Sequence, residues 1–396
     1  MIRVRSRKFL AVAVATCVAT FISLVAIEIW VRMAWDESRG TPGFFLSDPV
    51  LGQRLAANYD GWFAGVPART NSLGFRDIRE YTIPKPPGTV RIIVLGDSVT
   101  FGHGATFETS YPYLLEQRLR SWNPQVKWEV WNLGVPGYNT AQELAYLNEV
   151  GERYEPDLVV VGFFSNDFTG FEPDLRPGPL TRARSAVVRT MQRHVYSTEL
   201  YKRIYLTLRF RMTESKENQL RLAHLQTEDA LLGRPDVDQA EVHKLGNFER
   251  LSDAAVRTLD CSHMGAVDPP ALAADLNSRA PYLQSWFNAV EGFQALHRQG
   301  KHRIAFFINL APKECAGADR FVDFGTGGDN DALLEILGRD TPVVSSWREF
   351  LYYRPSQMPA AAGHSLGNSN LVKAQVLFDF LRASVLPPLM PGGVHR

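Results

Sequence analysis

A serine, a glycine, an asparagine and a histidine, far apart in the chain, have the side chains and spacing that acyl transfer requires. Ser98 follows Gly-Asp in a short turn sequence, and a serine hydroxyl becomes a nucleophile when a nearby base takes its proton. His364 is the candidate base. Gly137 offers a backbone N–H and Asn166 a side-chain amide, which are typical donors to an oxyanion. The combination predicts hydrolysis of an ester through a serine nucleophile, with these donors and the N–H of Ser98 as the oxyanion hole.

Each of these residues, taken alone, also has a plainer explanation. Gly-Asp-Ser is a common turn sequence, and Gly137 lies in an ordinary Gly-Pro loop. An Asn-Asp pair often caps a helix, and a histidine in a loop is often only exposed to solvent. The functional interpretation is favoured because the first three residues each follow an expected strand, and the histidine precedes the final helix.

The elements that must position these residues form an alternating pattern of strands and helices. Apolar runs typical of buried parallel strands occupy residues 91–95, 128–132, 157–164, 303–310 and 342–347. Helices are expected over 111–122, 140–154 and about 370–383. The alternation predicts an α/β fold, namely a three-layer α/β/α sandwich with a mostly parallel, flavodoxin-like sheet. Because the carboxyl ends of parallel strands meet at one edge, the candidate residues are expected to converge there.

The N-terminus has the features of a membrane anchor. Four basic residues lie within residues 3–8, and an apolar run extends from Phe9 to Ile27. A helix needs about 20 apolar residues to span a bilayer, and flanking basic residues stay on the cytoplasmic side. The alternative is a cleaved signal peptide, whose apolar core is usually about 7–15 residues long. The longer run favours an uncleaved anchor, with the rest of the chain outside the cytoplasm, on the periplasmic or extracellular side.

The pattern along the chain predicts one α/β domain with attachments. The expected parts are a cytoplasmic N-terminus (1–8), a transmembrane signal anchor (9–31), an extended lead-in (32–90), the α/β domain (91–385) and a tail (386–396). The segment at about 171–285 interrupts the strand–helix alternation, and we interpret it as a helical insertion that forms a wall or lid of the site.

Composition excludes some classes of partner. The formal net charge is +1, which gives no electrostatic reason to expect nucleic acid. We find no phosphate-binding loop or cluster of metal ligands in the sequence, so no cofactor and no metal site are expected. Of the three cysteines, Cys17 lies in the apolar run, whereas Cys261 and Cys315 either form a disulfide or remain two thiols.

The four segments together resemble the SGNH (GDSL) hydrolase superfamily, whose sequence blocks contribute a serine, a glycine, an asparagine and a histidine. The matching segments are GDSVTFG, NLGVPGYNT, FFSND and GHSLGNSNLVKAQVLFDFL. Asn71 to Asp77, NSLGFRD, is similar to a segment found upstream in membrane-anchored members. The resemblance implies an esterase with Ser98 and His364 as catalytic residues and no cofactor.

One position departs from the family pattern, which usually places an aspartate three residues before the histidine. Here that position is Ala361. An aspartate there would orient the imidazole, and its loss costs about 10⁴-fold in rate in a triad. Three arrangements are open: orientation of His364 by a backbone carbonyl, by a carboxylate such as Glu349 or Asp323, or an impaired site.

Location suggests substrates such as O-acyl groups of a surface glycan or of lipid. Two other functions remain open. An O-acyltransferase would use the same residues, whereas a glycan-binding or assembly protein would be catalytically impaired.

Overall fold

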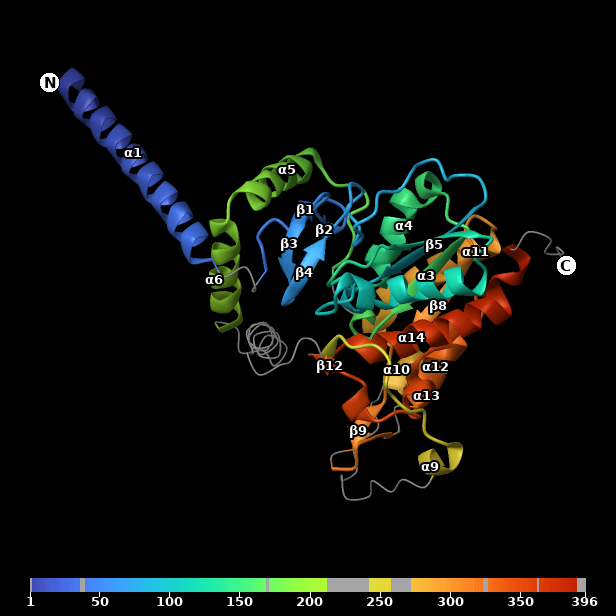
Figure 1. Ribbon diagram of the computed structural model, residues 1–396. Coiled ribbons are helices and arrows are strands. Elements are labelled where there is room, and N and C mark those ends of the chain that lie inside the picture. Colours follow the sequence, from blue (N-terminus) through green and yellow to red (C-terminus); the bar gives the residue numbers. More distant parts are fainter. Residues whose placement is uncertain are drawn as a thin grey trace.

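A five-stranded parallel sheet forms the centre of the protein in the computed structural model (Figure 1). Its strands are β5 (Thr89–Gly96), β6 (Lys127–Asn132), β7 (Leu158–Phe163), β8 (Ile304–Ile308) and β11 (Val343–Ser345). They lie in the order β11-β8-β7-β5-β6, and each neighbouring pair is parallel. Counted along the chain, this is the 2-1-3-4-5 order of flavodoxin-like sheets. The predicted fold class is confirmed.

The structure describes residues 2–35, 40–168, 171–211, 242–257, 272–315, 317–322, 327–361 and 363–389. Side-chain statements below are confined to these ranges. Asp323 and Cys261, which the sequence analysis named, lie outside them.

Helices cover both faces of the sheet, because alternate residues of each strand point to opposite sides. On β5, Ile93 and Leu95 belong to one apolar cluster, and Ile92 and Val94 to the other. The helices of the first cluster are α4 (Thr140–Tyr154), α11 (Gln284–Arg298) and α12 (Gly327–Leu337), and those of the second are α3 (Tyr111–Trp122) and α14 (Gly367–Phe380). The site residues lie at the end of this sandwich where the parallel strands finish.

The lead-in folds into two short hairpins before it reaches the sheet. They pair β1 (Phe45–Asp48) with β2 (Gly52–Leu55), and β3 (Asp60–Phe63) with β4 (Val66–Arg69).

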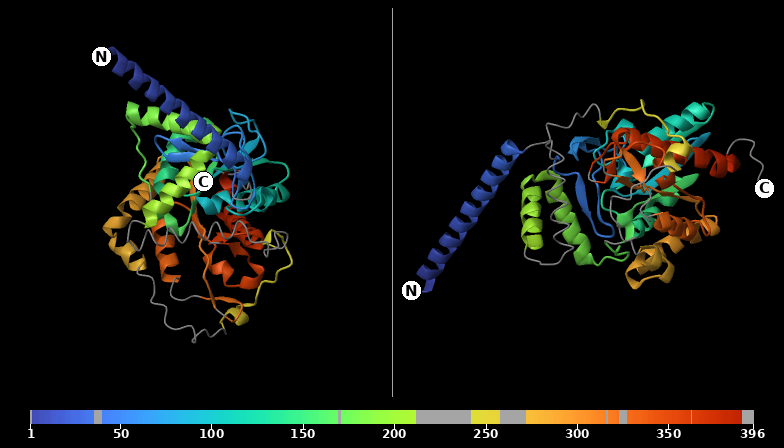
Figure 2. Two further views of the ribbon diagram at one scale, coloured as in Figure 1. Left: turned by 90° about the vertical axis from the view of Figure 1, so that its left-hand side faces the viewer. Right: turned by 90° about the horizontal axis from the view of Figure 1, so that it is seen from below.

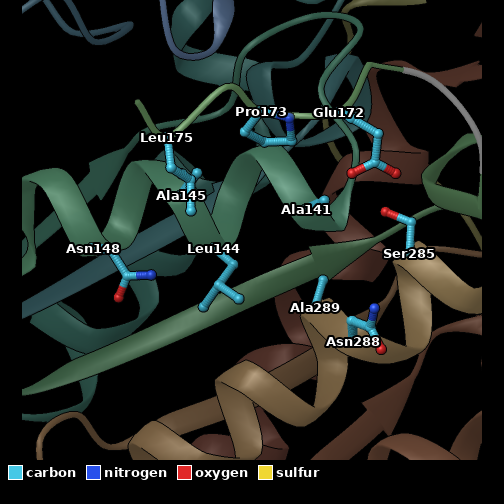
Figure 3. Close-up of a pocket in the computed structure, with 10 residues that line it drawn as sticks. All are labelled: Ala141, Leu144, Ala145, Asn148, Glu172, Pro173, Leu175, Ser285, Asn288 and Ala289. Carbon is cyan, nitrogen blue, oxygen red and sulfur yellow. The ribbon is translucent and has the colours of Figure 1, made fainter. Parts of the chain in front are cut away.

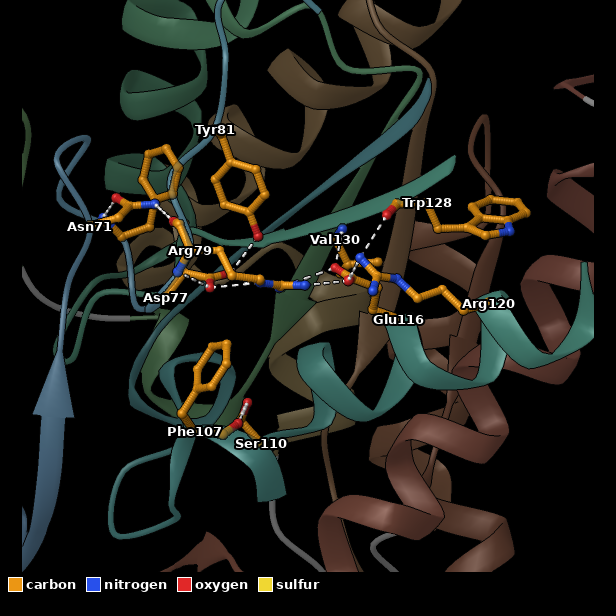
Figure 4. Close-up of polar contacts among 11 residues, drawn as sticks. Asn71, Asp77, Arg79, Tyr81, Phe107, Ser110, Glu116, Arg120, Trp128 and Val130 are labelled. Carbon is orange, nitrogen blue, oxygen red and sulfur yellow. Dashed lines mark hydrogen bonds and ion pairs between the residues drawn. The ribbon is translucent and has the colours of Figure 1, made fainter. Parts of the chain in front are cut away.

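A charge network then fastens the segment from Asn71 to Tyr81 to the sandwich (Figure 4). Arg79 bonds Asp77, with its Nη2 2.8 Å from Oδ2, and its guanidinium also pairs with Glu116 of α3. Glu116 in turn accepts from Val130 N of β6 at 2.8 Å. The lead-in is therefore joined both to α3 and to the edge strand of the sheet.

A long helix, α1 (Ile2–Ala34), projects from the folded domain (Figures 1 and 2). Within its stretch Phe9–Ala34 the mean hydropathy reaches 2.5, and the stretch is long and apolar enough to cross a membrane, a test that a signal sequence near the N-terminus also passes. Next to its inner end lie α5 (Pro179–His194) and α6 (Ser197–Arg211).

The remaining elements are short, and they surround the carboxyl end of the sheet and the α12 side of the domain. They are α2 (Ser98–Phe101), α9 (Asp253–Arg257), α10 (Leu272–Ser278), α13 (Trp347–Phe350), the hairpin of β9 (Lys313–Cys315) with β10 (Arg320–Val322), and the hairpin of β12 (Ala360–Ala361) with β13 (His364–Ser365). Cys315 of β9 is disulfide-bonded, whereas Cys17 is free.

The final helix begins at Gly367, three residues before the expected start. Its first turn is polar but buried, and two of its asparagine side chains donate to backbone carbonyls outside the helix. Asn368 Nδ2 donates to Gly246 O at 3.1 Å, and Asn370 Nδ2 donates to Ser365 O at 2.9 Å. These hydrogen bonds explain why polar residues continue the helix toward its N-terminus.

Candidate active site

Ser98 lies at the start of α2, directly after β5, and two neighbours fix the turn. The carboxylate of Asp97 caps the helix by accepting from Val99 N at 2.8 Å. Gly96 has φ 155°, and a Cβ there would lie 2.0 Å from Thr100 Oγ1. A larger residue therefore does not fit, and the turn holds the half-buried Ser98 hydroxyl at the carboxyl end of the sheet.

His364 reaches Ser98 from the other end of the chain. Its Nε2 lies 2.8 Å from Ser98 Oγ, although 266 positions separate the two residues. The imidazole is 7% exposed and stands on β13, where His364 is paired with Ala361 of β12. The position at which the family usually carries aspartate is thus directly across a two-residue hairpin from the histidine.

The carboxylates named as substitutes for that aspartate are placed differently. Glu349 Oε1 accepts from Arg250 Nε at 2.8 Å and from Tyr353 OH at 3.0 Å, so this carboxylate belongs to a separate ion pair. Asp323 lies outside the described residues.

A residue that the sequence analysis missed lies against the catalytic candidate. The ring of His103 is stacked on that of His364, with centroids 4.3 Å apart and an interplanar angle of 23°. Phe63 of the lead-in contacts the His103 ring edge to face, at 5.1 Å. The only signal in the sequence was that His103 follows Ser98 by five positions in GDSVTFGH.

The turn that carries His103 is clamped by Arg76 of the lead-in. The guanidinium donates to the carbonyl oxygens of Phe101 at 2.7 Å, Gly102 at 2.6 Å and Ala105 at 2.5 Å. It also lies 4.5 Å from the centre of the Phe101 ring. Arg76 is fully buried, and burial lowers its pKa to about 9. The upstream segment NSLGFRD therefore stabilises the turn that follows Ser98, through the hydrogen bonds of its Arg76.

The loop after β6 is tied to the same turn. Asn132 Nδ2 donates to Thr100 O at 3.0 Å, and Val135 N donates to Gly96 O at 2.9 Å. Gly137 stands exposed at the end of this loop with φ 82°. The loop that leads to Gly137 is thus fixed to the Ser98 turn at Asn132 and Val135, and Gly137 itself is exposed.

Asn166 lies in the short helix η3 (Ser165–Phe168), directly after β7. Burial raises the pKa of Asp97, and hydrogen bonds from Val99 N and from the side chains of Asn166 and Ser98 oppose that rise. The exposed Asn166 side chain therefore lies beside the residue that precedes Ser98.

Beneath these groups the sandwich buries further ionisable side chains that the sequence did not reveal. Burial raises the pKa of Glu143 on α4 well above its usual value, and repulsion from Asp167 and Asp97 adds to this rise. Lys373 on α14 donates to Asn309 O at 3.3 Å, and burial lowers its pKa to about 7 while Asp97 opposes that change. The floor of the site is closely packed and lined by ionisable side chains whose charged forms are disfavoured by burial.

A cavity of about 450 Å³ lies between α4, α11 and the segment 172–175 (Figure 3). Figure 3 shows Glu172 and Ser285 at one end, and the side chain of Leu144 in its wall. Neither Ser98 nor His364 lines this cavity.

Comparisons with known proteins address the family directly. Residues 94–255 match the model of the GDSL-like Lipase/Acylhydrolase family, a range that includes Ser98, Gly137 and Asn166 but not His364. An arylesterase from Vibrio mimicus is 32% identical over 98 residues, which is 24% of this chain and 48% of the arylesterase. The chain thus spans about half the length of this curated relative.

Solved structures of esterases are also similar at low identity. A two-domain esterase active on acetylated mannans is 11% identical with a TM-score of 0.35, covering 74% of this chain and 49% of that one. An acetyl xylan esterase from Geobacillus stearothermophilus is 12% identical with a TM-score of 0.34, covering 74% of this chain and 95% of that one. The family match over residues 94–255 and the arylesterase relative support the resemblance of this chain to the SGNH/GDSL hydrolase superfamily.

Proposed function

We propose that this protein is a membrane-anchored serine esterase in which Ser98 is the nucleophile and His364 the general base. The observation that carries the proposal is the 2.8 Å contact between Ser98 Oγ and His364 Nε2. A hydroxyl at the end of a central strand, with an imidazole in hydrogen-bond reach, is the arrangement that acyl transfer requires.

The reaction proceeds in two halves. His364 Nε2 takes the Ser98 proton as Oγ attacks the ester carbonyl carbon, and the tetrahedral intermediate collapses when its C–O bond to the alcohol breaks. The departing alcohol takes the proton from His364. Water then attacks the acyl-serine and passes its proton to the same nitrogen. Collapse of the second intermediate releases the carboxylic acid and returns the proton to Ser98.

The negative charge that develops on the carbonyl oxygen is assigned to three donors. These are the backbone N–H groups of Ser98 and Gly137 and the side-chain amide of Asn166. Support comes from the fixed β6 loop and from the position of Asn166 beside Asp97. Removing one such donor typically lowers kcat by about 10²–10³-fold.

Orientation of the base is assigned to His103 together with the β12–β13 hairpin. The stacked ring of His103 limits rotation of the His364 imidazole, which an aspartate at position 361 would otherwise restrain. Packing against the His103 ring thus helps to orient the base of the Ser-His pair.

Anchoring by α1 places the enzyme at a membrane. The basic residues before Phe9 are assigned to the cytoplasmic side, so the catalytic domain is extracytoplasmic. Substrates that fit this location are O-acyl groups of a surface glycan or of lipid. The similar two-domain esterase is active on acetylated mannans, which favours testing acetylated polysaccharides first.

The test compares wild type, Ser98→Ala and His364→Ala. Hydrolysis of p-nitrophenyl acetate and release of acetate from acetylated mannan are measured beside labelling by a fluorophosphonate probe. The proposal expects labelling and hydrolysis that both require Ser98. Wild-type protein that neither labels nor hydrolyses would instead support a non-catalytic glycan-binding role. Transfer of the acetyl group to an added glycan in preference to water would identify an acyltransferase.

A further inference from the structure

Helix α5 is unusual because the side that faces the protein is polar. Ser185 Oγ lies 2.8 Å from Ser47 Oγ of β1, and Arg189 Nε donates to Ser47 O at 3.0 Å. Ser47 N donates to Gln192 Oε1 at 2.7 Å. Ser185, Arg189 and Gln192 are spaced i, i+4 and i+7, so they form one stripe along the helix. This stripe attaches α5 to the lead-in hairpin.

The opposite side of α5 is apolar and exposed. Leu180, Val187 and Met191 are 83%, 61% and 47% exposed, and they recur at i, i+7 and i+11. A surface helix of a globular protein normally has its apolar stripe toward the core, which is the reverse of what α5 shows. The helix contains four arginines and no acidic residue. An arginine-rich helix with one apolar face is typical of helices that lie in a membrane interface.

The C-terminal end of α5 is fastened where the apolar stretch of α1 finishes. Glu28 of α1 accepts from Tyr196 N and Ser197 N, both at 2.9 Å. Arg32 donates to His194 O at 2.6 Å, and its guanidinium lies 4.3 Å from the centre of the Tyr196 ring. These contacts hold the α5–α6 turn at the level at which α1 meets water if the helix crosses a bilayer.

The direction of α5 is also the one expected for a helix that lies along the surface of a membrane crossed by α1. In Figure 1 and in the right view of Figure 2, α5 runs across the direction of α1. In Figure 1, α5 lies on the side of β1 that faces away from the parallel sheet, toward the region into which α1 projects. The apolar stripe therefore faces the space that a bilayer around α1 would fill.

We propose that α5 lies in the interface of the membrane that α1 spans, with Leu180, Val187 and Met191 among the lipid chains and the exposed Arg182, Arg184 and Arg193 among anionic headgroups. The proposal rests on the membrane anchoring included in the proposed function, and it does not depend on the esterase chemistry. It gives the protein a second lipid contact, which fixes the orientation of the domain as well as its location.

The experiment uses the full chain in nanodiscs of phosphatidylcholine, with or without phosphatidylglycerol. Natural Cys17 in α1 reports whether the anchor is inserted, and in a Cys17→Ser background Val187→Cys reports on α5. Ser121→Cys, on exposed α3, is the matched control. Each cysteine carries an environment-sensitive fluorophore, and quenching by lipid-attached doxyl groups is compared with quenching by aqueous iodide.

We expect doxyl quenching at positions 17 and 187, iodide quenching at 121, and at least a twofold stronger doxyl effect at 187 when phosphatidylglycerol is present. Arg182→Glu combined with Arg184→Glu should abolish that dependence on anionic lipid. Lipid quenching at 17 with iodide quenching at 187 overturns the inference and leaves the anchor intact. Shielding of 187 from both quenchers also overturns it, since a protein then covers the stripe. Iodide quenching at 17 overturns the anchor itself.

Discussion

The two halves of the Ser98–His364 pair are held in very different ways. The serine turn lies between buried strands and is fixed by the Asp97 cap, by the close approach of Gly96 to Thr100 and by the Arg76 clamp. The histidine stands on a two-residue hairpin and is restrained by the stacked ring of His103. A tightly packed turn tolerates few substitutions. In a short hairpin at the edge of the domain, by contrast, the histidine can be oriented by a stacked ring in place of an aspartate. This difference explains why the serine block follows the family pattern closely and the histidine block departs from it.

The largest expected effect removes the pair itself. Ser98→Ala and His364→Ala should each lower kcat by about 10⁴-fold or more, and the double variant should be no worse than either single one, because the two groups act as a unit. Steady-state kinetics with p-nitrophenyl acetate measures this. Additive losses would show that the two residues do not share a proton.

The rigidity of the serine side is tested by Gly96→Ala. A Cβ placed 2.0 Å from Thr100 Oγ1 forces the turn to shift, so we expect a loss of stability of about 3 kcal/mol or more. Urea denaturation followed by circular dichroism measures it. The control is Gly178→Ala, where nothing lies within 4 Å of the new methyl group. Equal stability of the two variants would contradict the comparison.

The histidine side is tested by His103→Ala and His103→Phe. Loss of the stacked ring should lower kcat by about 10-fold with little change in KM, whereas phenylalanine keeps the stack and should stay within about threefold of wild type. His194→Ala, which removes an exposed histidine on α5, is the matched control. If phenylalanine is as damaging as alanine, then stacking is not what His103 contributes.

A carboxylate returned to the hairpin should replace that stacking. Residues paired across an antiparallel bridge have Cβ atoms about 4.5–5.5 Å apart, which is within reach of an aspartate and an imidazole. Ala361→Asp should therefore raise kcat about threefold or more, and it should restore most of the activity that His103→Ala loses. An Ala361→Asn variant is the control for side-chain size. Failure to rescue would mean that the hairpin does not bring position 361 to the His364 ring.

The smallest expected effect concerns the ionisable side chains in the floor below the serine. Burial and repulsion raise the pKa of Glu143 above its value in the unfolded chain, so the folded protein binds the proton more tightly. Stability should therefore fall as the pH rises above about 4.5. Glu143→Gln should reduce the drop in Tm between pH 5 and pH 8, by about 2–4 °C for each kcal/mol of repulsion removed. Scanning calorimetry measures this, and exposed Glu172→Gln should leave the drop unchanged.

Much of the fold could be predicted because its signals are local. The helices at Tyr111–Trp122 and Thr140–Tyr154 have the expected bounds, and the second begins at a capping box between Asn139 and Gln142. The strands were recognisable as short apolar runs, and their alternation with helices gave the sheet type.

What the sequence could not predict depends on distant segments meeting. The stack of His103 on His364 joins parts of the chain more than 250 residues apart. Glu143 looks like an ordinary surface residue of an amphipathic helix, yet the helix turns it inward toward Asp167. The outward apolar stripe of α5 required knowing which side β1 covers.

The attachment of Glu28 and Arg32 to the α5–α6 turn has a mechanical consequence. A domain joined to a membrane anchor by a flexible linker can reach ester groups over a wide range of distances from the membrane. These contacts hold the C-terminal end of α1 against the α5–α6 turn. They therefore restrict the orientation of the folded domain relative to α1. If α1 anchors the protein as proposed, the site would stay at a nearly constant distance from the lipid, and large polymers would react only where they reach that distance.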